Sequence, residues 1–174
     1  MSSTIKLDIA CGQNKKEGFK GVDIAPGEGV DFVWDLEKYP WEPFKDHSVE
    51  EVNISHYVEH VKDLMKFMDE VWRICQHDAK ITIVGPYYTS IRAWGDPTHV
   101  RTLNEWTFLY FNKGWREANK LGHYPIHCNF NIDKMYTFFN PPWDQKSDEA
   151  KQFAQQHYWN VVSDIVFELK VVKD

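Results

Sequence analysis

Cysteine is scarce in this 174-residue sequence, and its spacing excludes one class of protein. The three cysteines, Cys11, Cys75 and Cys128, are odd in number and far apart, so they do not form a disulfide framework. No apolar run approaches the ~20 residues of a membrane span, and residues 1–6 lack the apolar core of a signal peptide. We therefore expect a protein of the reducing cytoplasm with no membrane partner.

Positive charge is also limited. The chain has 20 Lys and Arg against 26 Asp and Glu, which gives a formal net charge of −6. Nucleic acids and anionic membranes are bound through broad basic surfaces, which this balance does not favour. We expect nucleic acid not to be a partner, although a small basic patch is compatible with the composition.

The chain lacks internal repeats, linkers and low-complexity runs. Its length suits one domain with a real core. Aromatic residues make up 16 % of the sequence, and many of them follow position 86. We expect a single domain in which residues 1–88 bind a cofactor, while residues 89–174 provide substrate recognition or an interface.

Acidic residues accompany the first three predicted strands, which cover residues 5–10, 19–24 and 30–34. Asp8 lies inside the first strand, Asp23 near the end of the second, and Asp35 just past the third. The carboxyl ends of parallel strands face a ligand crevice in an open α/β sheet. We therefore expect the three carboxylates to surround one ligand.

Asp23 indicates what that ligand contains. A carboxylate at the end of the second strand can accept hydrogen bonds from both hydroxyls of a ribose. Residues 10–18 read ACGQNKKEG and lack the G-x-G-x-x-G turn that lets a backbone approach a pyrophosphate. Three carboxylates would repel a polyphosphate but suit a nucleoside with positive charge near its reacting atom. S-adenosylmethionine is such a ligand.

Four motifs carry a family resemblance: LDIACG, GFKGVDI, WDLEKYPW with PFKDHSVEEV, and SHYVEHV ahead of a predicted helix. On these motifs, the chain from residue 6 to about residue 111 resembles the class I S-adenosylmethionine-dependent methyltransferases. It is particularly similar to a compact subgroup found in bacterial and phage genomes. One departure is the CGQN sequence of residues 11–14, in which the usual second glycine is absent.

The resemblance implies positions for each part of the cofactor. Residues 10–12 would pass under the methionine part, Asp23 would hold the ribose, Asp35 and Leu36 would contact the adenine edge, and residues 53–57 would close over the sulfur. The expected product is S-adenosylhomocysteine. The full set of expected cofactor-binding residues is Asp8, Ala10, Cys11, Gly12, Asn14, Asp23, Ile24, Asp35, Leu36, Ser55 and His56.

The expected fold is an α/β, Rossmann-like sheet, mostly parallel and closed by a C-terminal antiparallel strand pair. Further strands are predicted at residues 49–55, 79–88, 128–139 and 161–172. Apolar residues at helical spacing predict a helix over 61–76, and further helices are predicted at ~103–120, capped at Thr102 or Asn104, and within 148–159. Residues 36–48 are predicted to be a loop whose aromatic side chains pack on the sheet or the adenine.

Two crossovers are too short for helices. Six residues separate Gly12 from Phe19, and residues 25–29 form an even shorter connection, whereas a βαβ crossover needs at least ~10–12 residues. Helices are therefore reduced on one face of the sheet, which we expect to be apolar. Residues ~103–120 and ~148–160, together with a second copy in a homodimer, are expected to cover it.

Methyl transfer from a sulfonium needs alignment and a group that removes a proton from the acceptor. The candidates are His56 and Tyr57 after the fourth strand, Tyr88 with its neighbour Tyr87 after the fifth, and His99 beyond. A structural hydrogen-bonding role for His56 stays open. Glu59 and His60 are expected to anchor the start of the following helix, where the dipole favours a carboxylate.

Two other motifs suggest chemistry that we do not favour. HYPIHC offers His123, His127 and Cys128 as metal ligands, but Pro125 prevents regular helical spacing, so no metal is expected. NPPW at residues 140–143 resembles a tetrapeptide of amino-methylating nucleic-acid enzymes, in which it follows the fourth strand. Here it follows a much later strand, and we expect a proline turn that ends that strand.

Three functions fit these observations. The favoured one is a methyltransferase whose acceptor is an unidentified small molecule. The second is a regulatory module that binds S-adenosylmethionine without turnover, and the third is a protein of the same fold that binds another nucleotide. Aromatic residues after position 86 could sandwich a planar or sugar-like acceptor, or could belong to the core or a dimer surface.

Overall fold

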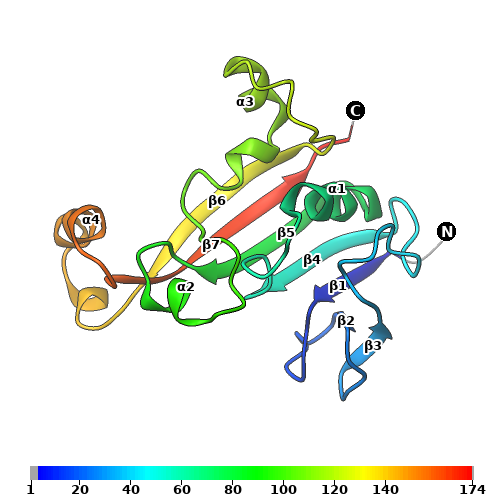
Figure 1. Ribbon diagram of the computed structural model, residues 1–174, viewed down its shortest axis with the longest axis horizontal. Coiled ribbons are helices and arrows are strands. Elements are labelled where there is room, and N and C mark those ends of the chain that lie inside the picture. The colour runs from blue at the N-terminus through cyan, green and yellow to red at the C-terminus, as the bar shows by residue number, and fades with distance from the viewer. Residues whose placement is uncertain (1–3, 174) are drawn as a thin grey trace.

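One seven-stranded sheet runs through the computed structural model, which describes residues 4–173 (Figure 1). Its strands lie in the order β3-β2-β1-β4-β5-β7-β6. Neighbours from β3 to β5 are parallel, whereas β7 is antiparallel to β5 and β6. The strands are β1 (Ile5–Ile9), β2 (Lys20–Asp23), β3 (Val30–Val33), β4 (Val49–Ser55), β5 (Cys75–Pro86), β6 (Phe130–Phe139) and β7 (Val162–Val171). The prediction of a mostly parallel sheet with a C-terminal antiparallel pair is confirmed.

The helical elements are short. They are α1 (Leu64–Ile74), α2 (Ile91–Gly95), the 3₁₀ turn η1 (Leu109–Phe111), α3 (Lys113–Ala118), the 3₁₀ turn η2 (Trp143–Gln145) and α4 (Asp148–His157). Within residues 4–173, none is both long and apolar enough to cross a lipid bilayer. Part of the segment 1–6, for which no signal peptide is expected, lies outside the described residues.

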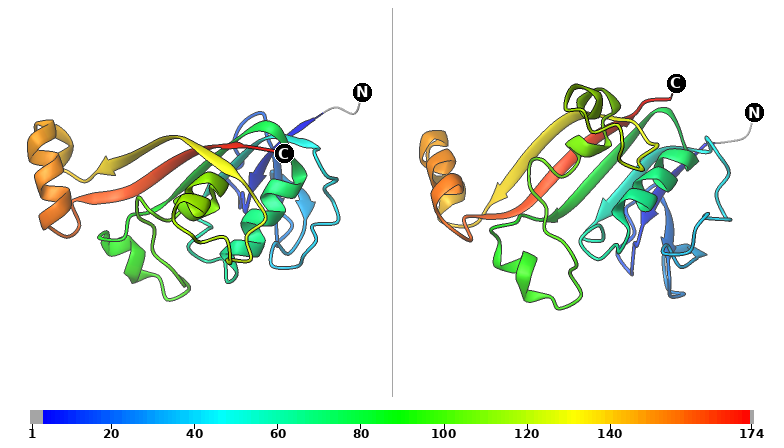
Figure 2. Two further views of the ribbon diagram at one scale, coloured as in Figure 1. Left: turned by 90° about the horizontal axis from the view of Figure 1, so that it is seen from above. Right: turned by 45° about the horizontal axis from the view of Figure 1, so that its top comes forward.

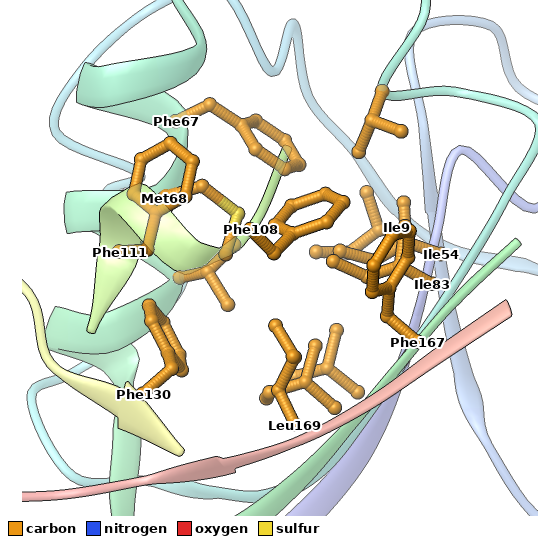
Figure 3. Close-up of a cluster of buried hydrophobic side chains, with 14 of the residues drawn as sticks. Ile9, Ile54, Phe67, Met68, Ile83, Phe108, Phe111, Phe130, Phe167 and Leu169 are labelled. Carbon is orange, nitrogen blue, oxygen red and sulfur yellow. The ribbon is translucent and has the colours of Figure 1, made fainter. Parts of the chain in front are cut away.

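The core lies on one face of the sheet, beneath α1 (Figure 3). Strand register aligns four side chains that are at most 2 % exposed: Leu7, Val52, Ile81 and Leu169. A second row lies two residues away in each strand, further along β1, β4 and β5 and earlier in the antiparallel β7: Ile9, Ile54, Ile83 and Phe167. Because strand side chains alternate between faces, both rows meet the apolar side of α1. Each such side chain contributes roughly 1.5–3 kcal/mol through burial.

α1 begins later than predicted. Asp63 is the N-cap, and its side chain accepts a hydrogen bond from the Lys66 backbone N–H at 3.1 Å. The chain is extended again at Cys75, so β5 starts four residues before the predicted strand at 79. Glu59 and His60 precede the cap and do not anchor the helix, so that expectation is wrong.

The loop at residues 36–48 is confirmed, and one tryptophan fixes it to α1. Trp41 is fully buried, its ring lies 5.5 Å from that of Phe67, and its Nε1 donates to the carbonyl of Leu36 at 3.0 Å. Its backbone N–H donates to the buried Glu70 carboxylate. The loop therefore packs on the helix that covers the sheet, as well as on the core.

The predicted helix over ~103–120 is wrong. The Asn104 side chain accepts from the Trp106 backbone N–H in a turn, and only η1 and α3 are helical. Asn112 separates these two elements, because its side chain caps α3 through the Trp115 N–H and also donates to the carbonyl of Phe130. A side chain that bonds to local backbone and to another strand favours a break over a continuous helix.

The helices cover a single face of the sheet. Figure 2 shows α1, α2 and α3 on the same side, while α4 stands beyond the ends of β6 and β7. The segment expected to cover the other face instead joins the existing core, since Phe108 lies 4.7 Å from Phe167, ring to ring. Reduced helices on one face are therefore confirmed, but the prediction that residues ~103–120 and ~148–160 cover that face is wrong.

The open face carries mostly polar side chains. The register places Lys80 between Glu51 and Lys170, and Thr82 lies between Asn53 and Glu168. Ion pairs tie neighbouring strands on this side, such as Lys6 with Glu51 at 2.7 Å and Lys134 with Glu168 at 3.6 Å. A sheet face of this composition is stable in water. Apolar side chains on this face gather near one end, where Val84 of β5, Val166 of β7 and the exposed Tyr136 of β6 are in register. They do not extend over the described strands as the expected wide patch, so a second copy is not required to cover the face. The homodimer stays a prediction.

Candidate functional site

The ends of β1 and β2 meet at a tight backbone turn. Ala10 and Gly12 both adopt left-handed conformations, with φ of +53° and +52°. This turn directs the Gly12 backbone N–H onto the Asp23 carboxylate, where it donates to Oδ2 at 2.9 Å. Oδ1 of Asp23 accepts only a longer bond, 3.2 Å, from the Ala25 N–H. The structure thus brings the predicted ribose-binding acid against the predicted methionine-binding turn.

Asp8 holds the loop after β1 in place through hydrogen bonds to both of its carboxylate oxygens. It is 4 % exposed, and its two oxygens accept from the Lys16 backbone N–H and the Asn53 side chain, both at 2.7 Å. With both oxygens engaged, Asp8 orders the loop after β1. A small cleft of about 210 Å³ opens above it, lined by Asp8, Ile9, Ala10, Cys11, Asn14, Asn53 and Ser55.

Without a helix after β1, the crossover packs directly on β2 at Gly21 and is held by an ion pair. A Cβ at Gly21 would overlap the carbonyl oxygen of Gly29 and would lie 2.6 Å from the Cys11 sulfur, so only glycine fits there. Lys15 lies over this glycine and pairs with Asp31 at 2.8 Å. Hydrogen bonds from Lys15 and Lys20 hold the pKa of Asp31 well below its ordinary range. Sequence reasoning missed this arrangement.

The third acid lies on the rim beyond β3. Asp35 accepts from the Glu37 backbone N–H at 3.1 Å, while Leu36 is buried. Tyr57 lies near these acids. Its burial raises its pKa, and the charges of Glu37, Asp35 and Asp23 raise the pKa further. Its hydroxyl therefore stays protonated at neutral pH. In this form the hydroxyl can donate a hydrogen bond to a ligand, and the role of Tyr57 as a base stays a prediction.

Ile24 is an exposed apolar member of the expected set. It follows Asp23 directly, and 67 % of its surface is open to solvent. An exposed apolar side chain beside a ribose-type acid offers a surface for a planar ring.

A larger cleft of about 520 Å³ lies past the end of β4. Its lining residues are His56, Glu59, His60, Pro86, Arg92, Gly95, Asp96, Pro97 and His99. The two clefts adjoin along the chain, because Ser55 lines the small one and His56 the large one. His56 has a left-handed backbone, φ +52°, which for a non-glycine residue is often found at functional sites.

Carboxylates flank the His56 ring on both sides. Nδ1 lies 3.5 Å from Glu59 Oε1, and Nε2 lies 3.9 Å from Asp164 Oδ1. Asp164 is itself held by Arg92, whose Nη1 contacts both of its oxygens at 3.0 and 2.8 Å. The ring is therefore oriented by two acids, one of which already has a cationic partner.

For Glu59 the structure differs most from the prediction, which placed it at the start of a helix. Its surface is 1 % exposed, and its Oε2 has no hydrogen-bond partner among the described residues. Within residues 4–173, one group of three possible metal ligands comes together, namely Glu59, His60 and His99. The only sequence signal was the acid–histidine pair in SHYVEHV, which was assigned to a helix start.

The remaining candidates divide between this cleft and other parts of the chain. Tyr88 lines a different pocket with Tyr87 and Glu105, and the Tyr87 hydroxyl donates to Glu105 at 2.6 Å. His99 lies in the large cleft, as a candidate base would. Of the HYPIHC histidines, His123 stacks on its neighbouring tyrosine, and the backbone of His127 donates to an aspartate on α1.

The NPPW segment is a turn that ends β6. The Asn140 backbone N–H donates to Val161, and the Trp143 N–H returns to the Asn140 carbonyl at 2.8 Å. The prediction of a proline turn is therefore confirmed.

The strand order, with β7 antiparallel between β5 and β6, gives the chain the fold of the class I S-adenosylmethionine-dependent methyltransferases. A SAM-dependent methyltransferase from Archaeoglobus fulgidus is 20 % identical, with 97 % of this chain and 86 % of that chain covered and a TM-score of 0.59. For a SAM-dependent methyltransferase from Methanosarcina mazei the identity is 15 %, the coverages are 100 % and 95 %, and the TM-score is 0.57.

A third solved structure is named for another reaction. The [4+2]-cyclase SpnF is 12 % identical, with 100 % of this chain and 77 % of that chain covered and a TM-score of 0.60. At such identities the likeness concerns the fold, and one fold supports different reactions. No protein-family model and no curated protein sequence matches the chain.

Proposed function

We propose that this protein is a methyltransferase that uses S-adenosylmethionine to methylate a small-molecule acceptor in the cytoplasm. The observation that carries the proposal is the contact of the Gly12 N–H with the Asp23 carboxylate at the ends of β1 and β2. The small cleft beside this turn is lined by Ser55, and the next residue, His56, lines the large cleft. Three buried cysteines without disulfides suit a reducing compartment.

The cofactor fits the polar character of the first site. Asp23 has one well-bonded oxygen and one weakly bonded oxygen, which leaves acceptor capacity for a ribose hydroxyl. Asp23, Asp35 and Glu37 raise the negative potential around Tyr57. This potential attracts the positive sulfonium and disfavours a nucleotide with several phosphates.

The chemistry requires little from the protein besides geometry. The acceptor atom attacks the methyl carbon, the carbon–sulfur bond breaks, and its electron pair returns to sulfur, which leaves neutral S-adenosylhomocysteine. The acceptor proton passes to a base. His56 is the best-placed base, since it lines the large cleft and Glu59 and Asp164 orient its ring. The 520 Å³ cleft suits an acceptor of small-molecule size.

Titration calorimetry with S-adenosylhomocysteine tests the cofactor assignment. The parent protein is expected to bind it, and Asp23→Ala is expected to lose roughly 1–3 kcal/mol because a polar ligand group is left unpaired. Asp133→Ala is a matched control, since Asp133 pairs with Lys170 on the open face. Equal binding by the parent and Asp23→Ala would refute the ribose assignment.

Turnover is measured separately. The protein is incubated with S-adenosylmethionine and the small-molecule fraction of a cell extract, and S-adenosylhomocysteine is quantified. Formation above that of the unsupplemented reaction supports methyl transfer. Binding without any formation would instead identify a module that holds the cofactor without turnover.

A further inference from the structure

The large cleft contains three side chains with metal-ligating atoms that point together. Glu59 and His60 follow β4, whereas His99 comes from the loop after α2. One ligand atom from each lies within 4.8 Å of the other two. The rings of His60 and His99 are 4.6 Å apart and nearly perpendicular, at 74°. The three residues therefore converge although they are 40 positions apart in sequence.

Hydrogen bonds fix which nitrogen of each ring is free. His99 Nδ1 lies 3.1 Å from the carbonyl of Ala93, which can only accept, so Nδ1 carries the proton. His60 Nδ1 lies 2.9 Å from the Thr98 hydroxyl, whose single proton is donated to Asp96 at 2.6 Å. His60 Nδ1 must then be the donor as well.

With Nδ1 as the donor, the lone pair of each imidazole lies on Nε2. Metal-binding histidines have this arrangement, in which the second nitrogen donates to a carbonyl or another acceptor and orients the ring. Asp96 Oδ2, 3.9 Å from His99 Nε2, adds a further negative oxygen nearby. Lone pairs and carboxylates gathered in this way favour a cation between them.

The carboxylate of Glu59 has an oxygen that a cation could pair with. It is 99 % buried and lines the cleft, Oε1 lies 3.5 Å from His56, and Oε2 has no partner among the described residues. A buried carboxylate oxygen without a partner is costly. A bound cation would remove that cost.

We propose that Glu59, His60 and His99 form a binding site for a divalent transition-metal ion such as Zn²⁺. Two imidazoles and one carboxylate suit Zn²⁺, Co²⁺ or Fe²⁺ better than Mg²⁺ or Ca²⁺, which prefer oxygen ligands. Tetrahedral zinc requires its ligand atoms to be about 3.4 Å apart. The three ligand atoms, which lie within 4.8 Å of one another, therefore move closer together on binding. Three protein ligands leave one position open to the cleft, where an acceptor oxygen could bind.

The test uses the full chain, freed of metal by a chelator, without S-adenosylmethionine. Its outcome is thus independent of the proposed methyl transfer. CoCl₂ is titrated and the visible absorption of Co²⁺ is followed, and ZnCl₂ binding is measured by calorimetry. One ion per chain is expected, with a visible band typical of tetrahedral or five-coordinate Co²⁺ that ZnCl₂ abolishes.

Variants locate the ion. His99→Ala is expected to weaken Zn²⁺ binding at least tenfold, and Thr98→Val, which removes the acceptor for His60 Nδ1, is expected to weaken it by about 10–100-fold. The double variant of His123→Ala and His127→Ala is the matched control, because it removes two histidines outside the cleft, and its binding is expected to equal that of the parent.

Near-UV circular dichroism shows whether each variant folds. Because a substitution of the buried Glu59 can itself prevent folding, His99→Ala is the deciding variant. No saturable Co²⁺ band in the parent would overturn the proposal. Unchanged Zn²⁺ affinity in His99→Ala, or loss of binding in the control alone, would do so as well.

Discussion

The close approach of two chain crossovers at Gly21 leads to a quantitative prediction. A methyl group there would overlap the backbone carbonyl of Gly29 and lie 2.6 Å from the Cys11 sulfur. The sulfur can move by leaving its rotamer, at a cost of about 0.5–1.5 kcal/mol. The carbonyl cannot rotate away, so the β2–β3 turn must shift. Overpacking of this kind costs typically 1–3 kcal/mol, and we expect Gly21→Ala to lose about 2–3 kcal/mol of unfolding free energy.

Urea denaturation followed by tryptophan fluorescence measures this loss as a lower midpoint at unchanged slope. Gly27→Ala is the control in the same connection, because its added Cβ would have only one neighbour, at 3.9 Å, and its φ is not positive. It is expected to change stability by less than about 0.5 kcal/mol. Equal midpoints for the two variants would refute the packing argument.

A double substitution separates the two clashes. Cys11→Ala combined with Gly21→Ala removes the sulfur but keeps the Gly29 carbonyl, so only part of the loss should be recovered, by about 0.5–1.5 kcal/mol. Displacement of the crossover also moves the Gly12 N–H away from Asp23, which it contacts at 2.9 Å. Binding of S-adenosylhomocysteine should therefore weaken in Gly21→Ala and remain in Gly27→Ala.

Two further predictions concern charge and proton transfer. The pKa of Asp31 is lowered in the folded state by Lys15 and Lys20, so its contribution to stability is present above its unfolded pKa of about 3.9 and is lost as pH falls below that value. Acid denaturation should accordingly be less steep in Asp31→Asn, and an identical pH profile would contradict the ion-pair argument. His56→Gln should lower S-adenosylhomocysteine formation by about 100-fold or more if His56 is the base, whereas Tyr88→Phe, in the separate pocket, should not; the reverse result would exchange their roles.

Local patterns in the sequence were sufficient for the strands. Short β-rich runs predicted β1 to β4 to within a residue or two, because alternation and turn residues are adjacent in the chain. The polar open face was also encoded locally. Residues 79–84 alternate small or apolar residues with Lys80 and Thr82 until Val84, which indicates a strand buried on one side only. The prediction of a wide apolar face overlooked this alternation.

The errors arose where distant segments decide the structure. Residues ~103–120 have helical spacing, but Asn112 bonds to the carbonyl of Phe130 on β6 and interrupts the helix. Glu59 was assigned to a helix start because an acid is favoured there, whereas Asp63 takes the cap. The convergence of Glu59 with His99 depends on the path of the loop after α2, about which the spacing of residues says nothing.

Among the described residues, no helix connects β1 to β2 or β2 to β3, yet the backbone at these strand ends is still ordered by hydrogen bonds. In a Rossmann-like sheet the helix after β1 presents backbone N–H groups to the ligand crevice. Here the six-residue crossover directs the N–H of Gly12 to Asp23 and that of Lys16 to Asp8. Lys15 and Asp31 hold this crossover against Gly21. The strand ends and this turn form the crevice by themselves, and the polar side chains of the open face make a covering layer of helices unnecessary.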